Sequence, residues 1–119
     1  TVVTCAPQVP CGAAAERVER ASGITLQPVS EEPDVRSALA RVTTGNADAA
    51  LVYTTDVRAS GGTVDGVDLT PAEQAAAESR YPIAVLTSGA QPRLANQFRE
   101  LVIGDTGRKV LTAAGFGVP

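Results

Sequence analysis

Apolar and polar positions along the chain alternate between strand-like and helix-like stretches. Strand-like apolar runs cover residues 1–5, 24–29, 49–53, 64–69 and 81–86. Short runs of this kind, bounded by Gly, Pro and Asp, are typical of β-strands. The run at 49–53 is apolar throughout, so we expect it to lie at the centre of a parallel sheet.

Helices are predicted between and after these runs. Apolar residues within 34–44 recur at the 3.6-residue period of an amphipathic helix, and Asp34 or Ser30 is the expected N-cap. Further helices are expected at 12–21, from Thr70 onward, at 91–103 and at 105–114. The alternation of strands and helices predicts an α/β fold in layers.

Composition narrows the function classes. The chain has 119 residues, enough for one domain, and its 44% hydrophobic and 19% charged content argues against intrinsic disorder. A net charge of −3, with two Tyr, two Phe and no Trp, offers neither a basic nor a stacking surface, so we expect no nucleic-acid partner. No apolar run approaches the roughly 18 residues of a membrane span, so no transmembrane segment is expected.

The side chains of ordinary catalysis are missing. The sequence has no His and a single Lys, Lys109. This excludes Ser-His-Asp and Cys-His catalysis and leaves no His-ligated metal site. We therefore expect a protein that is not an enzyme and that uses no cofactor and no side-chain metal ligands.

Two cysteines, Cys5 and Cys11, enclose a short Pro-containing loop. One interpretation is a small disulfide, which requires an oxidising compartment and Cα atoms within about 7 Å. The other is a pair of small, partly buried thiols. A redox enzyme is disfavoured, because the spacing is not that of a Cys-x-x-Cys motif and no basic group lies nearby in sequence.

Two predicted helix starts follow predicted strands, at Val9–Gly12 and Glu32–Val35. In a doubly wound sheet such loops meet at the carboxyl ends of the strands, where ligands bind. Free backbone N–H groups at helix starts can hold an anion without Arg or Lys. Tyr53, at the end of the 49–53 run, either adds a hydroxyl donor there or is an aromatic residue at the edge of the core.

Four strings of the sequence, taken together and in order, resemble one known family. They are CAPQVPCGAAAERV (5–18), SEEPDVRSALARVTTGNADAALVYTTDV (30–57), RYPIAVL (80–86) and AAGFGVP (113–119). They closely resemble the second half of the extracytoplasmic molybdate-binding proteins of molybdate ABC transporters, a type II periplasmic-binding-protein family. The combination of VPxG, DVRxAL and LVYxTD is more specific than any one of these motifs.

The resemblance implies a three-layer α-β-α lobe at residues 1–81. Residues 82–119 would be a return hinge strand and C-terminal helices that normally pack on a first lobe, which this chain lacks. The chain opens at Thr1 within an apolar run, so we expect a native N-terminal half to precede it. That half would carry two serines that complete the site.

The family's oxyanion donors correspond here to the backbone amides of Cys11 and Val35 and the hydroxyl of Tyr53. A Cys5–Cys11 disulfide would then fix the loop that presents the Cys11 amide. Many family members have Ala in place of Cys11, which still supplies a backbone N–H.

The implied function is capture of molybdate or tungstate outside the cytoplasm, in the periplasm or on a lipid-anchored protein. Expected partners are a molybdate ABC permease and either the missing N-terminal half or a second copy of the chain. An alternative is the oxyanion-sensing effector domain of a transcription regulator. The cysteine pair favours the exported protein.

Overall fold

The computed structural model describes residues 1–117, which form two compact units. The first runs from Thr1 to Ser79 and the second begins at Arg80. The boundary after residue 81 that the resemblance implies is a boundary between lobes of a longer protein, and it stays a prediction. Residues 118 and 119, which end the AAGFGVP string, lie outside the described residues.

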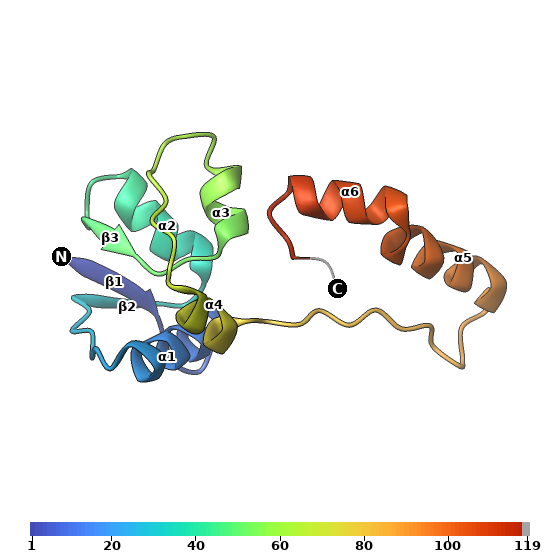
Figure 1. Ribbon diagram of the computed structural model, residues 1–119, viewed down its shortest axis with the longest axis horizontal. Coiled ribbons are helices and arrows are strands. Elements are labelled where there is room, and N and C mark those ends of the chain that lie inside the picture. Colours follow the sequence, from blue (N-terminus) through green and yellow to red (C-terminus); the bar gives the residue numbers. More distant parts are fainter. Residues whose placement is uncertain (118–119) are drawn as a thin grey trace. The chain divides into compact units, whose positions relative to one another are not determined.

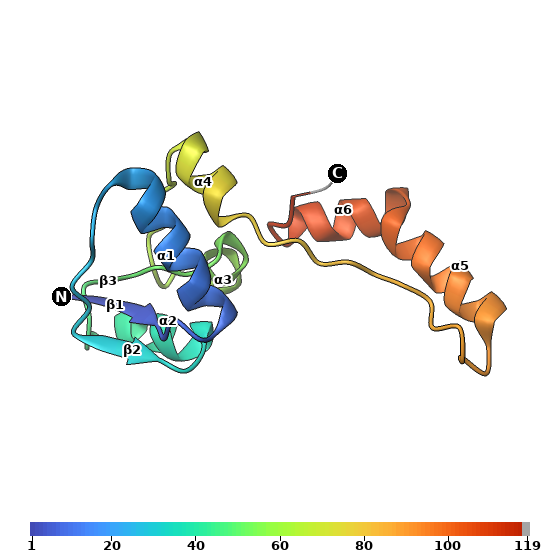
Figure 2. The same ribbon diagram turned by 90° about the horizontal axis from the view of Figure 1, so that it is seen from below.

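The first unit is a small parallel sheet between helices, as predicted for an α/β layered fold (Figures 1 and 2). Its strands, in the spatial order β2-β1-β3, are β1 (Val2–Cys5), β2 (Ser30–Glu32) and β3 (Ala49–Ala50). Its helices are α1 (Pro10–Ser22), α2 (Val35–Thr43), α3 (Thr54–Ala59) and α4 (Pro71–Ala77). Helices α1 and α4 lie on one side of the sheet and α2 on the other.

The predicted strand at 24–29 is wrong, because pairing with β1 begins only after Pro28. Pro lacks the N–H that a sheet ladder requires. The Leu26 N–H instead donates to the Glu19 carboxylate at 2.6 Å. The Val29 N–H reaches the Val2 carbonyl at 2.9 Å, and the parallel strand β2 follows at Ser30.

The prediction that the 49–53 run lies at the centre of the sheet is also wrong. Strand β1 is central among the described strands, and β3 forms one edge and ends at Ala50. Val52 and Tyr53 pack instead against a buried cluster formed by Cys5, Cys11 and Ala38. The apolar character of this run therefore reflects packing against that cluster rather than pairing on both sides of a strand.

The alternating stretch at 64–69 forms no strand. Two Asp residues and Gly66 lower its strand propensity, and Val67 is 91% exposed. The stretch is an irregular segment that leads to α4, whose N-cap Thr70 exchanges hydrogen bonds with Glu73. Arg17 of α1 donates to the Ala76 carbonyl at 2.9 Å and so ties α4 to α1.

The buried core of the first unit is built mostly from small side chains. Val3 and Ala38 are 1% and 0% exposed. The other buried residues of apolar type are Cys5, Ala6, Cys11, Ala14, Ala15, Val18 and Ala47. Small side chains allow α1 and α2 to lie close to β1, so the start of each helix is held near the end of the sheet.

The second unit consists of α5 (Pro92–Ile103) and α6 (Asp105–Ala113), joined at Gly104, as predicted. The strand predicted at 81–86 is wrong for the described residues, since this unit offers no neighbouring strand for it to pair with. The Tyr81 ring packs edge-on against Phe116, with ring centroids 6.0 Å apart. Within residues 1–117, no helix is long and apolar enough to cross a membrane.

Candidate anion-binding site

A disulfide joins the end of β1 to the first turn of α1. The Cα atoms of Cys5 and Cys11 are 5.6 Å apart, and the two residues are 2% and 8% exposed. Between them the chain makes a tight loop in which the Val9 N–H donates to the Ala6 carbonyl at 3.1 Å. The start of α1 is therefore held to the sheet by a covalent bond and by a hydrogen-bonded loop.

The three predicted donor residues meet around this disulfide. Cys11 forms a buried cluster with Cys5 and Ala38, and both Val35 and Tyr53 pack against that cluster. Val35 is the first residue of α2, and Tyr53 immediately precedes α3. Cys11, Val35 and Tyr53 are far apart in sequence but lie close together, each at a point where the chain enters a helix.

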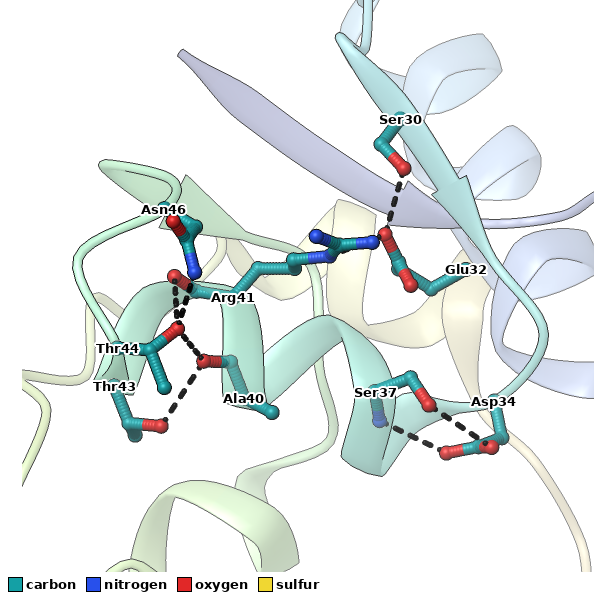
Figure 3. Close-up of polar contacts among 9 residues, drawn as sticks. All are labelled: Ser30, Glu32, Asp34, Ser37, Ala40, Arg41, Thr43, Thr44 and Asn46. Carbon is teal, nitrogen blue, oxygen red and sulfur yellow. Dashed lines mark hydrogen bonds and ion pairs between the residues drawn. The ribbon is translucent and has the colours of Figure 1, made fainter.

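Both helix starts present backbone N–H groups. Val9, the N-cap of α1, gives no side-chain cap, and Pro10 at the first helical position has no N–H of its own. At α2, the Asp34 carboxylate accepts from the N–H and the hydroxyl of Ser37, at 2.9 and 3.2 Å (Figure 3). The amides of Cys11 and Val35 lie in first turns, where N–H groups have no intrahelical acceptor.

Tyr53 is held by the helix that it precedes. Its backbone N–H donates to the Asp56 carboxylate at 3.1 Å, and its hydroxyl oxygen is buried. Asp56, in the first turn of α3, therefore caps the start of that helix. In the part of the chain that the structure describes, no group of three or more Asp, Glu, Cys or His side chains is arranged to hold a metal ion.

An ion pair between the buried Glu32 and the half-exposed Arg41 was not predicted. Glu32, at the end of β2, accepts from Arg41 Nε of α2 at 2.8 Å and from the Ser30 hydroxyl at 2.6 Å (Figure 3). A usable signal was present, because Arg41 lies three residues after the buried Ala38, on the flank of the same helix face.

Acid is expected to destabilise the first unit as Glu32 becomes protonated. Hydrogen bonds from Ser30 and Arg41 hold the pKa of Glu32 below its ordinary value of 4.5. A carboxyl whose pKa is lower in the folded state stabilises the fold above its unfolded pKa, and this contribution disappears as the pH falls through the folded pKa. Urea denaturation from pH 7 to pH 3 should show a smaller loss of stability in Glu32→Gln than in the wild type. Equal losses would contradict the assignment.

A three-layer lobe with helix starts gathered at strand ends defines a ligand-binding module of the kind found in solute-binding proteins. Residues 1–117 match the family described as bacterial extracellular solute-binding protein, and the chain belongs to that family. Its members are binding proteins that act outside the cytoplasm.

Curated relatives give a more particular likeness. The molybdate-binding proteins ModA of Mycobacterium bovis and of two strains of Mycobacterium tuberculosis are each 46% identical to this chain over 118 residues. The match covers 99% of this chain and 44% of each relative, so the chain spans less than half of their length. No solved structure matches the chain.

Proposed function

We propose that this chain is the second half of a longer solute-binding protein, here called the parent protein, that captures molybdate or tungstate for an ABC permease. The observation that carries the proposal is the meeting of Cys11, Val35 and Tyr53 at one buried cluster, in a chain 46% identical to ModA proteins. The similar proteins are solute-binding proteins, which favours transport over the sensor domain of a transcription regulator.

The proposed site binds the oxyanion with neutral donors. The amides of Cys11 and Val35 lie at helix starts, where each macrodipole places about half a positive charge. The Tyr53 hydroxyl adds a donor from the start of α3. Because such a site offers donors and no proton acceptor, it disfavours protonated phosphate, and the size of the completed cavity disfavours sulfate.

The two units are proposed to correspond closely, though not residue for residue, to different lobes of the parent protein. Residues 1–81 form the second lobe, and residues 82–119, which include both helices of the second unit, return to the first lobe and pack on it. Support comes from the large apolar side chains that the second unit leaves exposed: Leu86, Leu94, Phe98, Leu101 and Val110 are between 55% and 74% exposed. The N-terminal half of the parent protein would cover them; a second copy of the chain is the other candidate.

We place the parent protein outside the cytoplasmic membrane, free in the periplasm or anchored by lipid. A structural disulfide between Cys5 and Cys11 supports this placement, because such bonds persist in oxidising compartments.

Tyr53→Phe is expected to weaken molybdate binding by the parent protein about tenfold, the loss expected from one hydrogen bond to an anion. Tyr81→Phe is the matched control, because Tyr81 is 69% exposed and lies in the second unit. Calorimetric titration of both variants should show weaker binding in the first alone. If Tyr53→Phe binds as tightly as the wild type, the hydroxyl is not a donor.

A further inference from the structure

Glu32 ties β2 to α2 through its side chain. The carboxylate is 7% exposed and accepts from Arg41 of α2 and from Ser30 of its own strand (Figure 3). Val35, the first residue of α2, follows Glu32 by three positions. Arg41 lies in the last turn of α2, so the ion pair fastens that end of the helix to the end of β2 and thereby orients the helix that begins at Val35.

The backbone of Glu32 holds the other helix start. Its carbonyl accepts from the Ala6 N–H at 2.8 Å, and Ala6 is the first residue after β1. The Ala6 carbonyl in turn accepts from the N–H of Val9, the N-cap of α1. One residue thus contacts both the loop that leads to Cys11 and the segment that leads to Val35.

A carboxylate near an oxyanion site weakens anion binding, because the two negative charges repel each other. Arg41 compensates the negative charge, and Asp34 is the other charged group whose field acts on Glu32. Only the Glu32 side of this pair is buried, and such a pair is weak evidence for stability, whereas it can impose one geometry on the elements that it joins. This combination of poor electrostatics and close geometry indicates a positional role.

We propose that Glu32 is a positioning residue of the anion site: it holds the starts of α1 and α2 so that the Cys11 and Val35 amides face one ligand. The inference rests on the function proposed above. It assigns to Glu32 no contact with the anion.

The first test compares Glu32→Gln with Glu31→Gln in the parent protein. Glu31 is the exposed neighbour in β2, and its replacement removes the same charge. Loss of a negative charge alone should leave molybdate affinity unchanged or raise it in both variants. Loss of positioning should weaken binding about tenfold in Glu32→Gln only, the size expected when a charged hydrogen bond is lost. Equal behaviour of the two variants would overturn the proposal.

Arg41 supplies the second test. If Glu32 acts through its ion pair, Arg41→Gln should weaken binding by a similar factor, and the double variant Glu32→Gln/Arg41→Gln should be little worse than either single one. Losses that simply multiply would mean that the two residues act independently, which contradicts a shared positional role.

A measurement on the ligand-free chain tests the positioning role of Glu32 independently of molybdate binding. Amide hydrogen exchange, followed by NMR on the 119-residue chain, should be faster at Ala6 and Ser37 in Glu32→Gln than in Glu31→Gln. The Ala6 N–H donates to the Glu32 carbonyl in the loop that leads to α1, and the Ser37 N–H donates to the Asp34 carboxylate in the first turn of α2. Unchanged exchange at both amides would overturn the positioning role. A parent protein that fails to bind molybdate would overturn the proposed function, and the exchange data would still decide the role of Glu32.

Discussion

Replacing Cys5 and Cys11 together by Ala is expected to lower the free energy of unfolding of this chain by about 2 kcal/mol. The cysteines are six positions apart, and cross-linking a loop of this size removes about that much conformational entropy from the unfolded chain. Loss of the buried sulfur atoms adds to the effect, because Cys5 lies in the core. Urea denaturation under non-reducing conditions measures the difference.

The wild type treated with a reductant is the control for this variant, since it loses the bond and keeps the sulfur atoms. It should lie between the oxidised wild type and the double variant. In the parent protein, opening the bond should also weaken molybdate binding, because the loop that presents the Cys11 amide loses its covalent tie to β1. Unchanged stability and unchanged affinity after reduction would show that the disulfide supports neither the fold nor the site.

Gly12→Ala is expected to destabilise the chain by about 2–3 kcal/mol. A Cβ atom at this position would lie 2.0 Å from the Ala6 carbonyl oxygen and 2.7 Å from that of Cys5. These are backbone atoms, so the start of α1 must move away from the loop, at the cost usual for overpacking. In an unobstructed helix the same change is favourable by roughly 0.5–1 kcal/mol, so the sign of the effect is diagnostic.

Gly117→Ala is the matched control. Apart from its neighbours in the chain, no atom of residues 1–117 lies within 4 Å of a Cβ placed there, and the backbone at Gly117 is not in the left-handed region. Thermal unfolding should show a lower midpoint for Gly12→Ala and an unchanged one for Gly117→Ala. A Gly12→Ala chain as stable as the wild type would contradict the close approach of α1 to Ala6.

The sequence predicted the helices of this protein well, because their signals are local. The apolar period in 34–44, the Asp34 cap and the Thr-Pro start at Thr70 each act within a few residues. Gly104 was likewise sufficient to divide α5 from α6. These features depend on neighbours in the chain and little on the rest of the fold.

Strands were predicted less well, because a strand depends on its partners. The run at 81–86 has strand-like composition, yet no strand of its unit lies beside it in the described residues. Pro28 was a local signal that could have shifted the second strand to its observed start at Ser30. For the 49–53 run, composition alone could not separate pairing on both sides from packing against a buried cluster.

The candidate site likewise has features that local sequence signals predict and features that depend on tertiary packing. The two helix starts and Tyr53 could be proposed from the order of strands and turns, and the family resemblance singled out the amides of Cys11 and Val35. For the Glu32–Arg41 pair, the position of Arg41 on α2 was a local signal, but the choice of Glu32 as its partner depends on how α2 packs against β2. Sequence patterns indicate which groups reach the carboxyl ends of the strands, and tertiary packing decides what holds them there.

Calorimetric titration of the parent protein with molybdate, tungstate, sulfate and phosphate decides whether it is an oxyanion-binding protein of this specificity. We expect tight, one-to-one binding of molybdate and tungstate, with sulfate and phosphate at least a hundredfold weaker, a difference of about 2.7 kcal/mol. A parent protein that bound neither molybdate nor tungstate, or that bound all four anions alike, would contradict this expectation.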